Sequence, residues 1–596
     1  MLPCLIFEDE HLLVVNKPAG LNTHAPSPYA GEGLFDWLRN REARWARLAI
    51  THRLDKETSG VMVFAKTRLS NRSLTAQFTA RSVHKKYLLL TDRPARRGQF
   101  TVKSALVRAG ERYVSRPVHS GGETAETRFT EGRTGDWCRV VGAEPLTGRT
   151  HQIRVHAAES GFPILGDTLY GGTAAPRVYL HAAELMLKHP ASGEELTFRA
   201  PTGNDWPRIL TPSQAENSSK ESALRHPEHG RDAFHRVPIP HSPGRGGTRP
   251  SHAASEVHGE ASEGHAQPAS ALPCLALREA LIEPDSTDAY RVIHAASDGW
   301  PGLYVERLGE YLLSQSAQAL SSAQREELAR FAEVFSARGV YHKVLTRQVH
   351  RAARTEASPQ LILGSEAPAR FMVQENGLHY ELSFAEGYST GLFLDQRDNR
   401  RRLLTRHVAS DFPLLPFSIG NGQWELLNVF AYTCGFSVCA AKARARTTSL
   451  DLSRRWLDWG KRNFALNQLE PAGHEFFYGE AFDWLRRLAK KARRFDVIVL
   501  DPPTFSQSKE SGVFQAEKDY GRLVTASLPL LGAGGVLFAS TNATDWPPDK
   551  FLAAVDKAIH AAGRRVLQRH YVPQSPDFPV SRAEPAYLKT AWLRVE

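Results

Sequence analysis

Charged and hydroxyl-bearing side chains crowd one short stretch near the start of the chain, ITHRLDKETSGVMVFAK at residues 50–66. The residues after Gly60 alternate in character and predict a mostly buried strand, with the glycine at its entry. Asp55 is therefore expected on a loop that leads into a sheet. Because most polar clusters between strands are turns, this stretch is either a solvated turn or a functional site.

A second cluster of basic side chains occurs in PLTGRTHQIRVHAAESGFPILGDTLYGG, at residues 145–172. Four basic residues stand there at nearly alternate positions: Arg149, His151, Arg154 and His156. The apolar Ile153 and Val155 lie between them, which predicts a strand. A basic row beside a sheet suits a phosphate group or an acidic side chain. Tyr87, in VHKKYLLL at residues 83–90, is expected where another short strand begins.

The carboxyl-terminal half contains the order strand, tight turn, helix and strand in ELLNVFAYTCGFSVCAAKARARTTSLDLS, residues 425–453. With Asp451 at the end of the second strand, this order forms one half of a doubly wound nucleotide-binding fold. The turn brings backbone N–H groups to an anionic group, and the acid can bind two ribose hydroxyls. The GxGxxG pattern of dinucleotide folds is missing, which argues against NAD. The alternative for Asp451 is an ordinary acid at a strand end.

A further buried strand, in FDVIVLDPPTFSQSK at residues 495–509, ends in Asp501 and two prolines. Prolines after a strand stiffen a loop at the carboxyl edge of the sheet, where such folds bind ligands. The segment GAGGVLFASTNATDW at residues 532–546 then predicts a turn, a strand and a polar loop.

Size and composition limit the classes of protein. The 596 residues predict several domains, and no apolar run reaches the roughly 18 residues of a membrane helix. The start, MLPCLIFEDEHLLVV, does not look like a secretion signal. Five scattered cysteines without a CxxC pair indicate a reducing compartment and argue against structural zinc. We therefore expect a cytoplasmic protein, and the net charge of +11 favours nucleic acid as the partner.

The segment from Ser213 to Ser270 is rich in Ser, Gly, Pro and His and poor in large apolar residues. It cannot bury enough surface to offset the entropy of ordering, so it is predicted to be a disordered linker. Its histidines have no ligand spacing, and no metal site is expected. The chain is thus predicted to carry two modules on one tether: residues 1–212, linker 213–270, a small domain 271–385 and a larger domain 386–596.

The first module resembles the RluA type of RNA pseudouridine synthase. HRLDKETSG and GRTHQIRVH carry the resemblance, together with EDEHLLVVNKPAGLNTHAP near the start, and it extends from residue 5 to about residue 210. It implies a mixed α/β fold with a bent, mainly antiparallel sheet, RNA as substrate and no cofactor.

The resemblance also implies the roles of four residues. Asp55 is the carboxylate that acts as nucleophile on the sugar or base, or stabilises a separated intermediate. Arg154 is its cationic partner, because an ionised carboxylate in a closed site needs one. Tyr87 stacks on the base and serves as a candidate general base. Arg53 helps to extrude the target nucleotide.

The second module resembles class I S-adenosylmethionine-dependent methyltransferases over residues 385–596. GYSTGLFLDQRDNRRRL at 387–403 is similar to the entry motif of the ribosomal RNA large-subunit methyltransferase I/K family, and residues 287–313 resemble the small domain that precedes it. The implied architecture is a Rossmann-like domain preceded by a small α+β domain. The implied cofactor residues lie in five segments: Gln396, Arg397, Asn428, Phe430, Tyr432, Thr433, Gly435, Asp451, Leu452, Glu480, Ala481 and Asp501.

These residues divide by the part of the cofactor that the resemblance gives them. The turn at residues 428–435 cradles the methionine part, Asp451 holds the ribose, and Glu480 and Ala481 occupy the adenine position. Asp501 flanks the methyl-transfer site with Pro502, and Gln396 and Arg397 line the pocket. Cys434 stands where relatives often carry Gly, and a left-handed backbone there costs Cys more than Gly.

The atom that is methylated can be narrowed from the cysteines. Methylation of cytosine C5 needs a thiolate that adds to C6. Family members with that chemistry carry a Cys in the loop after the GGVLF strand, whereas residues 540–543 here read Ser-Thr-Asn-Ala. A ring or exocyclic nitrogen needs only positioning. The sequence is more similar to the K branch, so guanine N7 is the preferred acceptor.

The leading interpretation is a bifunctional RNA-modification enzyme that acts on ribosomal RNA rather than transfer RNA. One alternative is an active pseudouridine synthase whose second module is a non-catalytic RNA-binding adaptor, and Cys434 favours it slightly. Another alternative is a methyltransferase with a non-RNA substrate, since Asp-Pro-Pro loops occur in such enzymes too.

Overall fold

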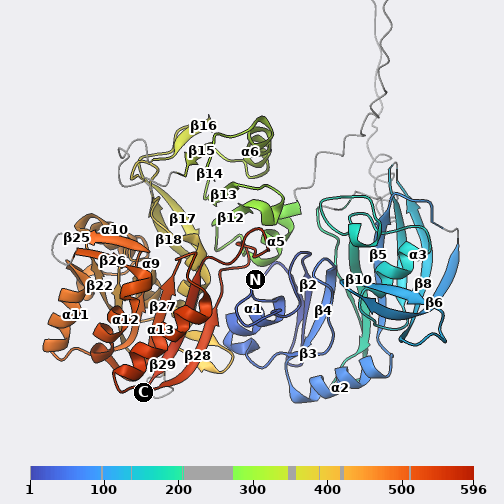
Figure 1. Cartoon of the computed structure of the whole chain (residues 1–596), viewed down its shortest axis with the longest axis horizontal. Helices are drawn as coiled ribbons and strands as arrows, with labels where there is room; N and C mark the ends of the chain where they lie inside the picture. Colours follow the sequence, from blue (N-terminus) through green and yellow to red (C-terminus); the bar gives the residue numbers. More distant parts are fainter. Residues whose placement is uncertain are drawn as a thin grey trace, which may run out of the picture. The chain divides into compact units, whose positions relative to one another are not determined.

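The computed structural model describes residues 2–95, 98–135, 137–204, 206, 273–345, 358–387, 389–415, 422–508 and 512–596. The predicted linker at 213–270 lies outside them. Residues 1–203 and 272–596 form one compact unit, coloured from blue to red along the chain in Figure 1.

The amino-terminal part is built on an eleven-stranded sheet in which β1, β2, β4, β10, β5, β9, β8, β6 and β7 follow one another. In addition, β3 pairs with β4 and β11 with β10. The pairs are antiparallel except for β4 and β10, which run parallel. The strands are β1 (Leu5–Glu8), β2 (Leu12–Lys17), β3 (Ala49–Ile50), β4 (Ser59–Ala65), β5 (His84–Thr91), β6 (Gln99–Ala109), β7 (Arg112–Arg116), β8 (Glu123–Thr134), β9 (Arg139–Pro145), β10 (Leu180–Lys188) and β11 (Glu195–Arg199).

Apolar clusters on both halves of the sheet stabilise it. Around β2 and β4 the sheet packs against α1 (Leu34–Arg41) and α2 (Arg68–Thr79), and Val63 and Leu74 lie in that core. Around β5 and β9 it packs against α3 (Gln152–Glu159), with Phe129 and Ile153 inside. The ring of Tyr87 borders both clusters, which places it at the junction of the two halves of the sheet. The mixed α/β fold with a mainly antiparallel sheet is confirmed.

The middle of the chain forms a small α+β region. It begins with α5 (Pro273–Leu281) and contains a five-stranded sheet in the order β12, β13, β14, β15, β16 with α6 (Ser322–Val334). A separate hairpin, β17 and β18, follows. The strands are β12 (Ala289–His294), β13 (Leu303–Leu308), β14 (Tyr311–Ser316), β15 (Gly339–Val344), β16 (Gln360–Gly364), β17 (Phe371–Glu375) and β18 (Leu378–Leu382).

The carboxyl-terminal part is a doubly wound sheet in the order β23, β22, β21, β24, β27, β29, β28. The first five strands are parallel, and β29 and β28 add an antiparallel edge. The strands are β21 (Trp424–Val429), β22 (Ala445–Asp451), β23 (Glu475–Tyr478), β24 (Phe495–Leu500), β27 (Leu531–Thr541), β28 (Val566–Val572) and β29 (Lys589–Val595). Their buried, nearly continuous apolar runs are typical of parallel strands covered on both faces.

In the described part of the chain, six helices and several short elements complete this domain. The sheet order reverses at β21, so the strand ends beside β24 form the topological switch point where such folds bind ligands. The helices are α8 (Arg397–Thr405), α9 (Gly435–Lys442), α10 (Arg454–Leu466), α11 (Ala481–Lys490), α12 (Ala516–Ser527) and α13 (Pro548–Ala561). The pairs β19 (His407–Ala409) with β20 (Phe412–Pro413), and β25 (Phe505–Ser508) with β26 (Gly512–Gln515), lie outside the main sheet.

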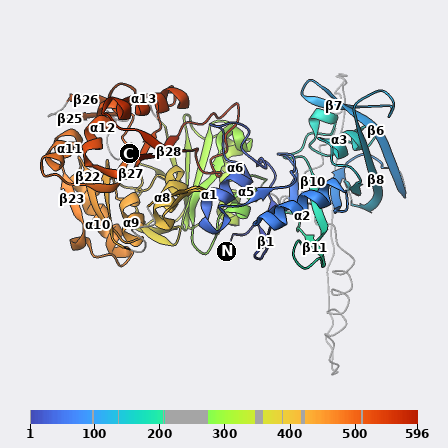
Figure 2. The same cartoon turned by 90° about the horizontal axis from the view of Figure 1, so that it is seen from below.

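The two modules contact each other within this unit. Leu277 and Leu281 of α5 lie in the same apolar cluster as α1, and the backbone N–H of Cys4 donates to Ala280 O over 3.0 Å. The view in Figure 2 shows α1 and α5 near one another. Polar contacts also join α1 to α8, among them Trp37 to Asp398 at 3.0 Å. The modules are thus joined by packing as well as by the chain between them.

Candidate active sites

The four residues predicted for the first module line one cavity. It has a volume of about 1010 Å³, and its walls include Arg53, Asp55, Tyr87 and Arg154. Asp55 lies on the loop between β3 and β4, as the sequence predicts. Residues far apart in the chain are therefore brought to one cavity, which favours a functional site over a solvated turn.

The loop that carries Asp55 is held by buried polar groups that the sequence analysis missed. Lys17 is completely buried, and its Nζ donates to the carbonyl oxygens of Pro18, Leu21 and Lys56 at 2.9, 2.7 and 3.2 Å. Burial lowers the pKa of Lys17 to about 7. The hydroxyl of Thr23 donates to Leu54 O at 2.7 Å. The sequence offers Lys17 at the end of an apolar strand as the only sign of this role.

Arg154 lines the cavity but does not bind Asp55 directly. Its Nε and Nη2 donate to the two carboxylate oxygens of Asp167, each over 2.7 Å, and Glu57 lies at 4.0 Å. Burial works against the charge, but the hydrogen bonds and charge of Asp167, with Asp55 and Glu57, raise the pKa of Arg154. The group within ion-pair distance of Asp55 is His151, whose Nε2 lies 4.0 Å from Oδ2. Burial lowers the pKa of His151, so this contact is not a strong ion pair at neutral pH.

Tyr87 lies within β5, three residues after the strand begins. Burial raises the pKa of its hydroxyl, and the negative charge of Asp55 raises it further. A phenol with a raised pKa is rarely ionised near neutral pH, which argues against Tyr87 as a general base. Arg53 is exposed, and its Nη2 donates to Thr150 Oγ1 at 3.1 Å.

The expected strand at GRTHQIRVH is wrong, because residues 152–159 form the helix α3. Alternation of apolar and polar residues suggested a strand, but nearly every residue of this helix is buried, polar ones included. Gln152 donates to Thr127 Oγ1 at 2.9 Å, and His156 shares a hydrogen bond of 2.9 Å with Ser104. These partners are remote in sequence, so periodicity alone could not reveal them.

In the second module, five of the predicted cofactor residues line another cavity. It has a volume of about 280 Å³, and the five are Phe430, Asp451, Leu452, Glu480 and Ala481. The cavity also has apolar walls from Phe482 and Phe514. It lies at the carboxyl ends of β21 and β22, where the fold is expected to bind a nucleotide.

Asp451 holds the turn after β21 in place. Its carboxylate accepts the backbone N–H of Tyr432 at 2.9 Å and that of Ser453 at 2.8 Å. Burial raises its pKa, and these two hydrogen bonds oppose the rise. A carboxylate has about four acceptor positions, so two stay available for ribose hydroxyls. Glu480 caps α11 by accepting Asp483 N at 2.9 Å. Apolar walls with such acceptors fit an adenosine group.

The turn at residues 430–435 has an unusual backbone. Phe430, Tyr432 and Cys434 all have positive φ, at 64°, 49° and 64°. Non-glycine residues in this region cost about 1–3 kcal/mol each and cluster at functional sites. Cys434 therefore adopts the left-handed conformation that relatives are expected to give to Gly. Its thiol packs against Gly460, where an added Cβ would overlap the sulfur atom and lie 2.9 Å from Cys434 Cβ.

The remaining predicted cofactor residues on β21 and its turn do not line the 280 Å³ cavity. Asn428 is buried, and its amide donates to Ser437 Oγ at 2.9 Å. Thr433 is buried too, and its hydroxyl donates to Gly391 O at 2.6 Å. Gly435 begins α9. The hydrogen bonds of Asn428 and Thr433 support the turn from within the protein, whereas Phe430 lines the cavity.

Asp501 lies at the end of β24, beside Gln396 and Ser540. The amide of Gln396 donates to Ser540 Oγ at 2.8 Å and contacts both carboxylate oxygens of Asp501 at 3.3 Å. Burial raises the pKa of Asp501 to about 6, and the charge of Asp395 adds to this, while hydrogen bonds from Ser540 and Gln396 lower it. Gln396 is thus placed at the predicted methyl-transfer site.

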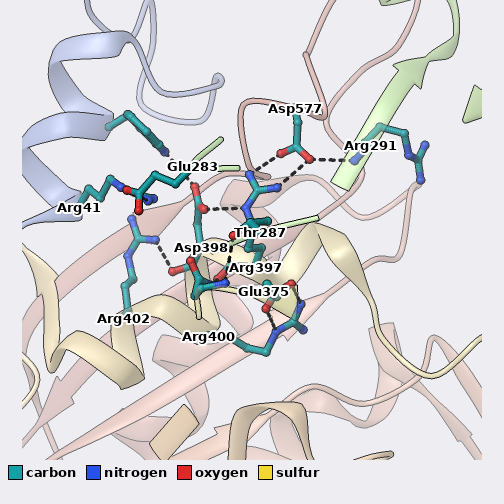
Figure 3. A network of polar contacts seen from close by, with 12 residues as sticks. Arg41, Glu283, Thr287, Arg291, Glu375, Arg397, Asp398, Arg400, Arg402 and Asp577 are labelled. Atoms are coloured by element: carbon teal, nitrogen blue, oxygen red, sulfur yellow. Dashed lines mark hydrogen bonds and ion pairs between the residues drawn. The ribbon is translucent and has the colours of Figure 1, made fainter. Parts of the chain in front are cut away.

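The prediction that Arg397 lines the cofactor pocket is not what the structure shows. Its guanidinium points into a buried ionic network and donates to Asp577 at 2.9 and 2.6 Å (Figure 3). Arg400, one turn later, binds Glu375 in the same way at 2.7 and 2.6 Å. Gln396 and Arg397 have different partners because adjacent residues at the start of α8 point in different directions.

The loop beyond β27 carries hydroxyl and amide groups. Asn542 Oδ1 accepts a hydrogen bond from Thr504 Oγ1 at 2.6 Å, which ties this loop to the Asp-Pro-Pro loop. All five cysteines are free and lie among the described residues, and none lines either cavity. Burial raises the pKa of each thiol, so none is poised as a thiolate.

Among the described residues, no group of three or more His, Cys, Asp or Glu side chains could hold a metal ion. In the same part of the chain, no helix is long and apolar enough to span a membrane.

Two family models match the chain in succession. The model of RNA pseudouridylate synthase matches residues 11–159, and that of S-adenosylmethionine-dependent methyltransferase matches residues 315–593. The predicted resemblance, the two enzyme classes and S-adenosylmethionine as cofactor are thereby confirmed. The predicted domain boundaries stay predictions.

Individual relatives agree with this division. Ribosomal RNA large subunit methyltransferase from Deinococcus radiodurans is 33% identical over 334 residues, which are 54% of this chain and 77% of that protein. Ribosomal RNA large subunit methyltransferase I from Escherichia coli O139:H28 is 30% identical over 321 residues, 53% of this chain and 77% of that protein. Ribosomal large subunit pseudouridine synthase C from Yersinia pestis is 40% identical over 219 residues, 34% of this chain and 66% of that protein.

These relatives bear on the predicted methyl acceptor. The Escherichia coli relative is named methyltransferase I, so the similarity to the K branch and the preference for guanine N7 gain no support. RNA modification as the general function is supported by both halves of the chain. The chain belongs to the ribosomal RNA large subunit methyltransferase family and carries an RNA pseudouridylate synthase module ahead of its methyltransferase.

Proposed function

We propose that the chain converts uridine to pseudouridine and methylates a base nitrogen in ribosomal RNA. For the first activity, the observation that carries the proposal is the meeting of Asp55, Tyr87, Arg53 and Arg154 at one cavity of about 1010 Å³. Ribosomal RNA as the substrate rests on the names of the relatives of both halves.

The first reaction is an isomerisation that needs no cofactor. The N1–C1′ bond of uridine breaks, the C5–C1′ bond forms, N1 gains a proton and C5 loses one. Asp55 attacks the sugar or base, or stabilises the separated fragments, as the nucleophile of this site. Tyr87 keeps its proton and stacks on the base. Arg53, at the exposed edge, occupies the place of the unstacked nucleotide, whose extrusion costs a few kcal/mol.

Arg154 places a positive charge near Asp55 from its buried position. Its two hydrogen bonds to Asp167 fix the guanidinium, and its charge interacts with Asp55 across the cavity. Arg154 therefore acts on Asp55 through its charge rather than through a direct ion pair. His151, which contacts Asp55 at 4.0 Å, is a second neighbour that can take up or release a proton near the reacting base.

For the second reaction, Asp451 and the walls of the 280 Å³ cavity would hold the adenosine part of the cofactor. S-adenosylmethionine, when bound, supplies a methyl group on a positively charged sulfur. Asp501 can accept an N–H of the target base and hold it in line, with its carboxylate oriented by Gln396. A nitrogen acceptor is favoured because no cysteine lies at this site to activate a ring carbon.

The test uses ribosomal RNA from a host strain that lacks the gene. The purified protein is incubated with this RNA and S-adenosylmethionine, and the nucleosides are measured by mass spectrometry. The wild type should form pseudouridine and one N-methylated base. Asp55→Asn should lose only the pseudouridine. Asp451→Asn should lose only the methylated base, together with cofactor binding in calorimetry.

Asp458→Asn is the matched control, since Asp458 is half exposed and pairs with the exposed Lys461 one turn away. It should keep both products. An active Asp55→Asn variant would refute the catalytic assignment, and a 5-methylcytosine product would refute the nitrogen acceptor. A wild type that does not bind S-adenosylmethionine would favour the adaptor alternative, which the strained turn at Cys434 makes worth testing.

A further inference from the structure

A third cavity lies between the small α+β region and the methyltransferase domain. Its volume is about 150 Å³, and a cavity of this size holds a single benzene-sized ring. Strands β12, β13, β14 and β15 contribute one wall, and the segment 389–395 contributes the opposite wall. The side chains of Phe578 and Tyr587 complete it.

Charged groups in this cavity are fixed in position. Arg291 donates to Glu306 at 2.7 Å, and its guanidinium lies over the ring of Phe578 with 4.6 Å to the centroid. Opposite, Asp395 accepts the hydroxyl of Tyr587 at 3.0 Å. Carboxylates and cations held in this way present acceptors and donors to the edge of a planar ligand.

The cavity adjoins the predicted methyl-transfer site. Asp395 lines it, and the next residue, Gln396, contacts Asp501. The charge of Asp395 is also one of the causes that raise the pKa of Asp501. Phe393 also lines the cavity, and its ring lies 5.3 Å from that of Tyr432 in the cofactor turn. Phe393 is 50% exposed, so its ring stands at the entrance.

We propose that this cavity receives the target base, as a single nucleobase extruded from the RNA. The base enters past Phe393, which stacks on it, and Glu306, Arg291 and Asp395 recognise its polar edge. The base then lies beside Asp501 with its acceptor atom toward the cofactor cavity. The inference rests on the proposed methylation of RNA, and it assigns to the small α+β region a part in substrate recognition.

Several observations favour a base over other ligands. The walls combine aromatic rings with both donors and acceptors, whereas a phosphate site would present cations and N–H groups without carboxylates. An enzyme that modifies a base must take it out of its stack, and the flipped base is read by hydrogen bonds and stacking. Phe393 at the entrance can stack on the base, and the charged side chains inside the cavity can form hydrogen bonds with its edge.

The experiment compares two variants of the full chain. Phe393→Ala removes the exposed ring, and Gln315→Trp places a large side chain into the cavity from β14. Single-turnover methyl transfer to ribosomal RNA from the deletion strain should fall by roughly 5- to 150-fold in Phe393→Ala, the range found for loss of base stacking. In Gln315→Trp it should fall at least as far, because the base is excluded.

Three readouts separate this proposal from its alternatives. Calorimetric affinity for S-adenosylmethionine and pseudouridine formation should stay within about twofold of the wild type in both variants, a difference below 0.5 kcal/mol. Met372→Ala and Leu363→Trp are the controls, since both residues are exposed on nearby strands outside the cavity. They should leave methyl transfer, affinity for S-adenosylmethionine and pseudouridine formation unchanged.

The outcomes are distinguishable. A wild type that methylates RNA while both cavity variants keep full methyl transfer would overturn the proposal and leave the proposed function intact. A wild type that binds S-adenosylmethionine but methylates no RNA would overturn both. Loss of cofactor affinity in Gln315→Trp together with loss in Phe393→Ala would assign the cavity to the cofactor instead of the base.

Discussion

Arg154 binds Asp167 with two hydrogen bonds of 2.7 Å, although it lines the same cavity as Asp55. Both side chains of this pair are almost completely buried, at 5% and 1% exposure. The buried carboxylate of Asp167 thus fixes the position of the Arg154 guanidinium. Asp55, the nucleophile that we propose, is therefore not the hydrogen-bond partner of Arg154.

The first prediction concerns this pair. Asp167→Asn leaves Arg154 buried with one neutral partner, and breaking a buried pair costs about 3–5 kcal/mol. We expect a lower midpoint of urea unfolding and a fall in pseudouridine formation, because Arg154 can then turn toward Asp55. Equilibrium unfolding and single-turnover assays would measure the two effects.

Glu126→Gln provides the matched control for Asp167→Asn. Glu126 pairs with Lys103 at 3.3 Å on the partly exposed surface of β6 and β8, where such pairs contribute about 0–1 kcal/mol. Its stability should change little. Equal loss in the two variants would show that the Arg154 pair has no special structural role.

A second prediction concerns the close packing of Cys434 and Gly460. Gly460→Ala adds a methyl group that overlaps the Cys434 thiol, and overpacking of this kind costs about 1–3 kcal/mol. We expect weaker binding of S-adenosylmethionine in calorimetry, since the displaced residue belongs to the turn at residues 430–435, which we propose holds the cofactor. Cys434→Gly should restore binding in the double variant, because it removes both contacting atoms and suits the positive φ.

The single variant Cys434→Gly serves as the reference for that double variant. If Gly460→Ala binds the cofactor as the wild type does, the turn is flexible enough to move away, and its strained backbone is not essential. If the double variant fails to recover, the methyl group must disturb a neighbour other than Cys434.

The third prediction follows from the raised pKa of Asp501, about 6 in the folded protein against 3.8 for the free side chain. For an acid with a raised pKa, the contribution to stability is fully present below the unfolded pKa and is lost as pH rises through the folded pKa. The wild type should therefore lose stability relative to Asp501→Asn between about pH 4 and pH 6.

Urea unfolding of both proteins at several pH values without cofactor measures this difference. Asp395 and Arg400 act on the same carboxylate, and the Asn variant keeps both, so their effects largely cancel in the comparison. If the difference in unfolding free energy between the two proteins does not change with pH, burial does not raise the pKa of Asp501.

The sequence revealed much of the parallel sheet and of both sites, because local patterns determine them. The strand, turn, helix and acid at residues 425–453 could be read directly, and the structure places Asp451 at the cavity as expected. Asp55 could be placed on its loop for the same reason. What these segments share is that their chemistry and their secondary structure lie in adjacent residues.

The misreadings arise where partners are remote. Helix α3 looks like a strand because its polar residues are buried. Their partners are Ser104 on β6 and Thr127 on β8, both outside the segment 145–172, and Asp167, 13 residues after Arg154. Arg397 looks like a pocket residue because it follows Gln396, but Asp577, 180 residues later, binds it. The third cavity could not be foreseen, since its walls come from two regions that the sequence describes separately.

The last prediction concerns the contact between the two modules. Trp37 of α1 is buried and donates to Asp398 Oδ2 at 3.0 Å, and Arg41 binds Glu283 at 3.1 Å. Burial acts to raise the pKa of Asp398, but the charges of Arg397, Arg41 and Arg402, with Trp37, hold it below its usual value. This ionised network would be costly to leave half-satisfied, so the modules should stay together without a covalent link.

A protease site inserted into residues 213–270 tests this. After cleavage, the two fragments should elute together in size-exclusion chromatography, and the combined variant Trp37→Ala with Arg41→Ala should separate them. Arg582→Ala is the control, because its contact with Glu111 is fully exposed. Wild-type fragments that separate at once would show that only the connecting segment joins the two activities.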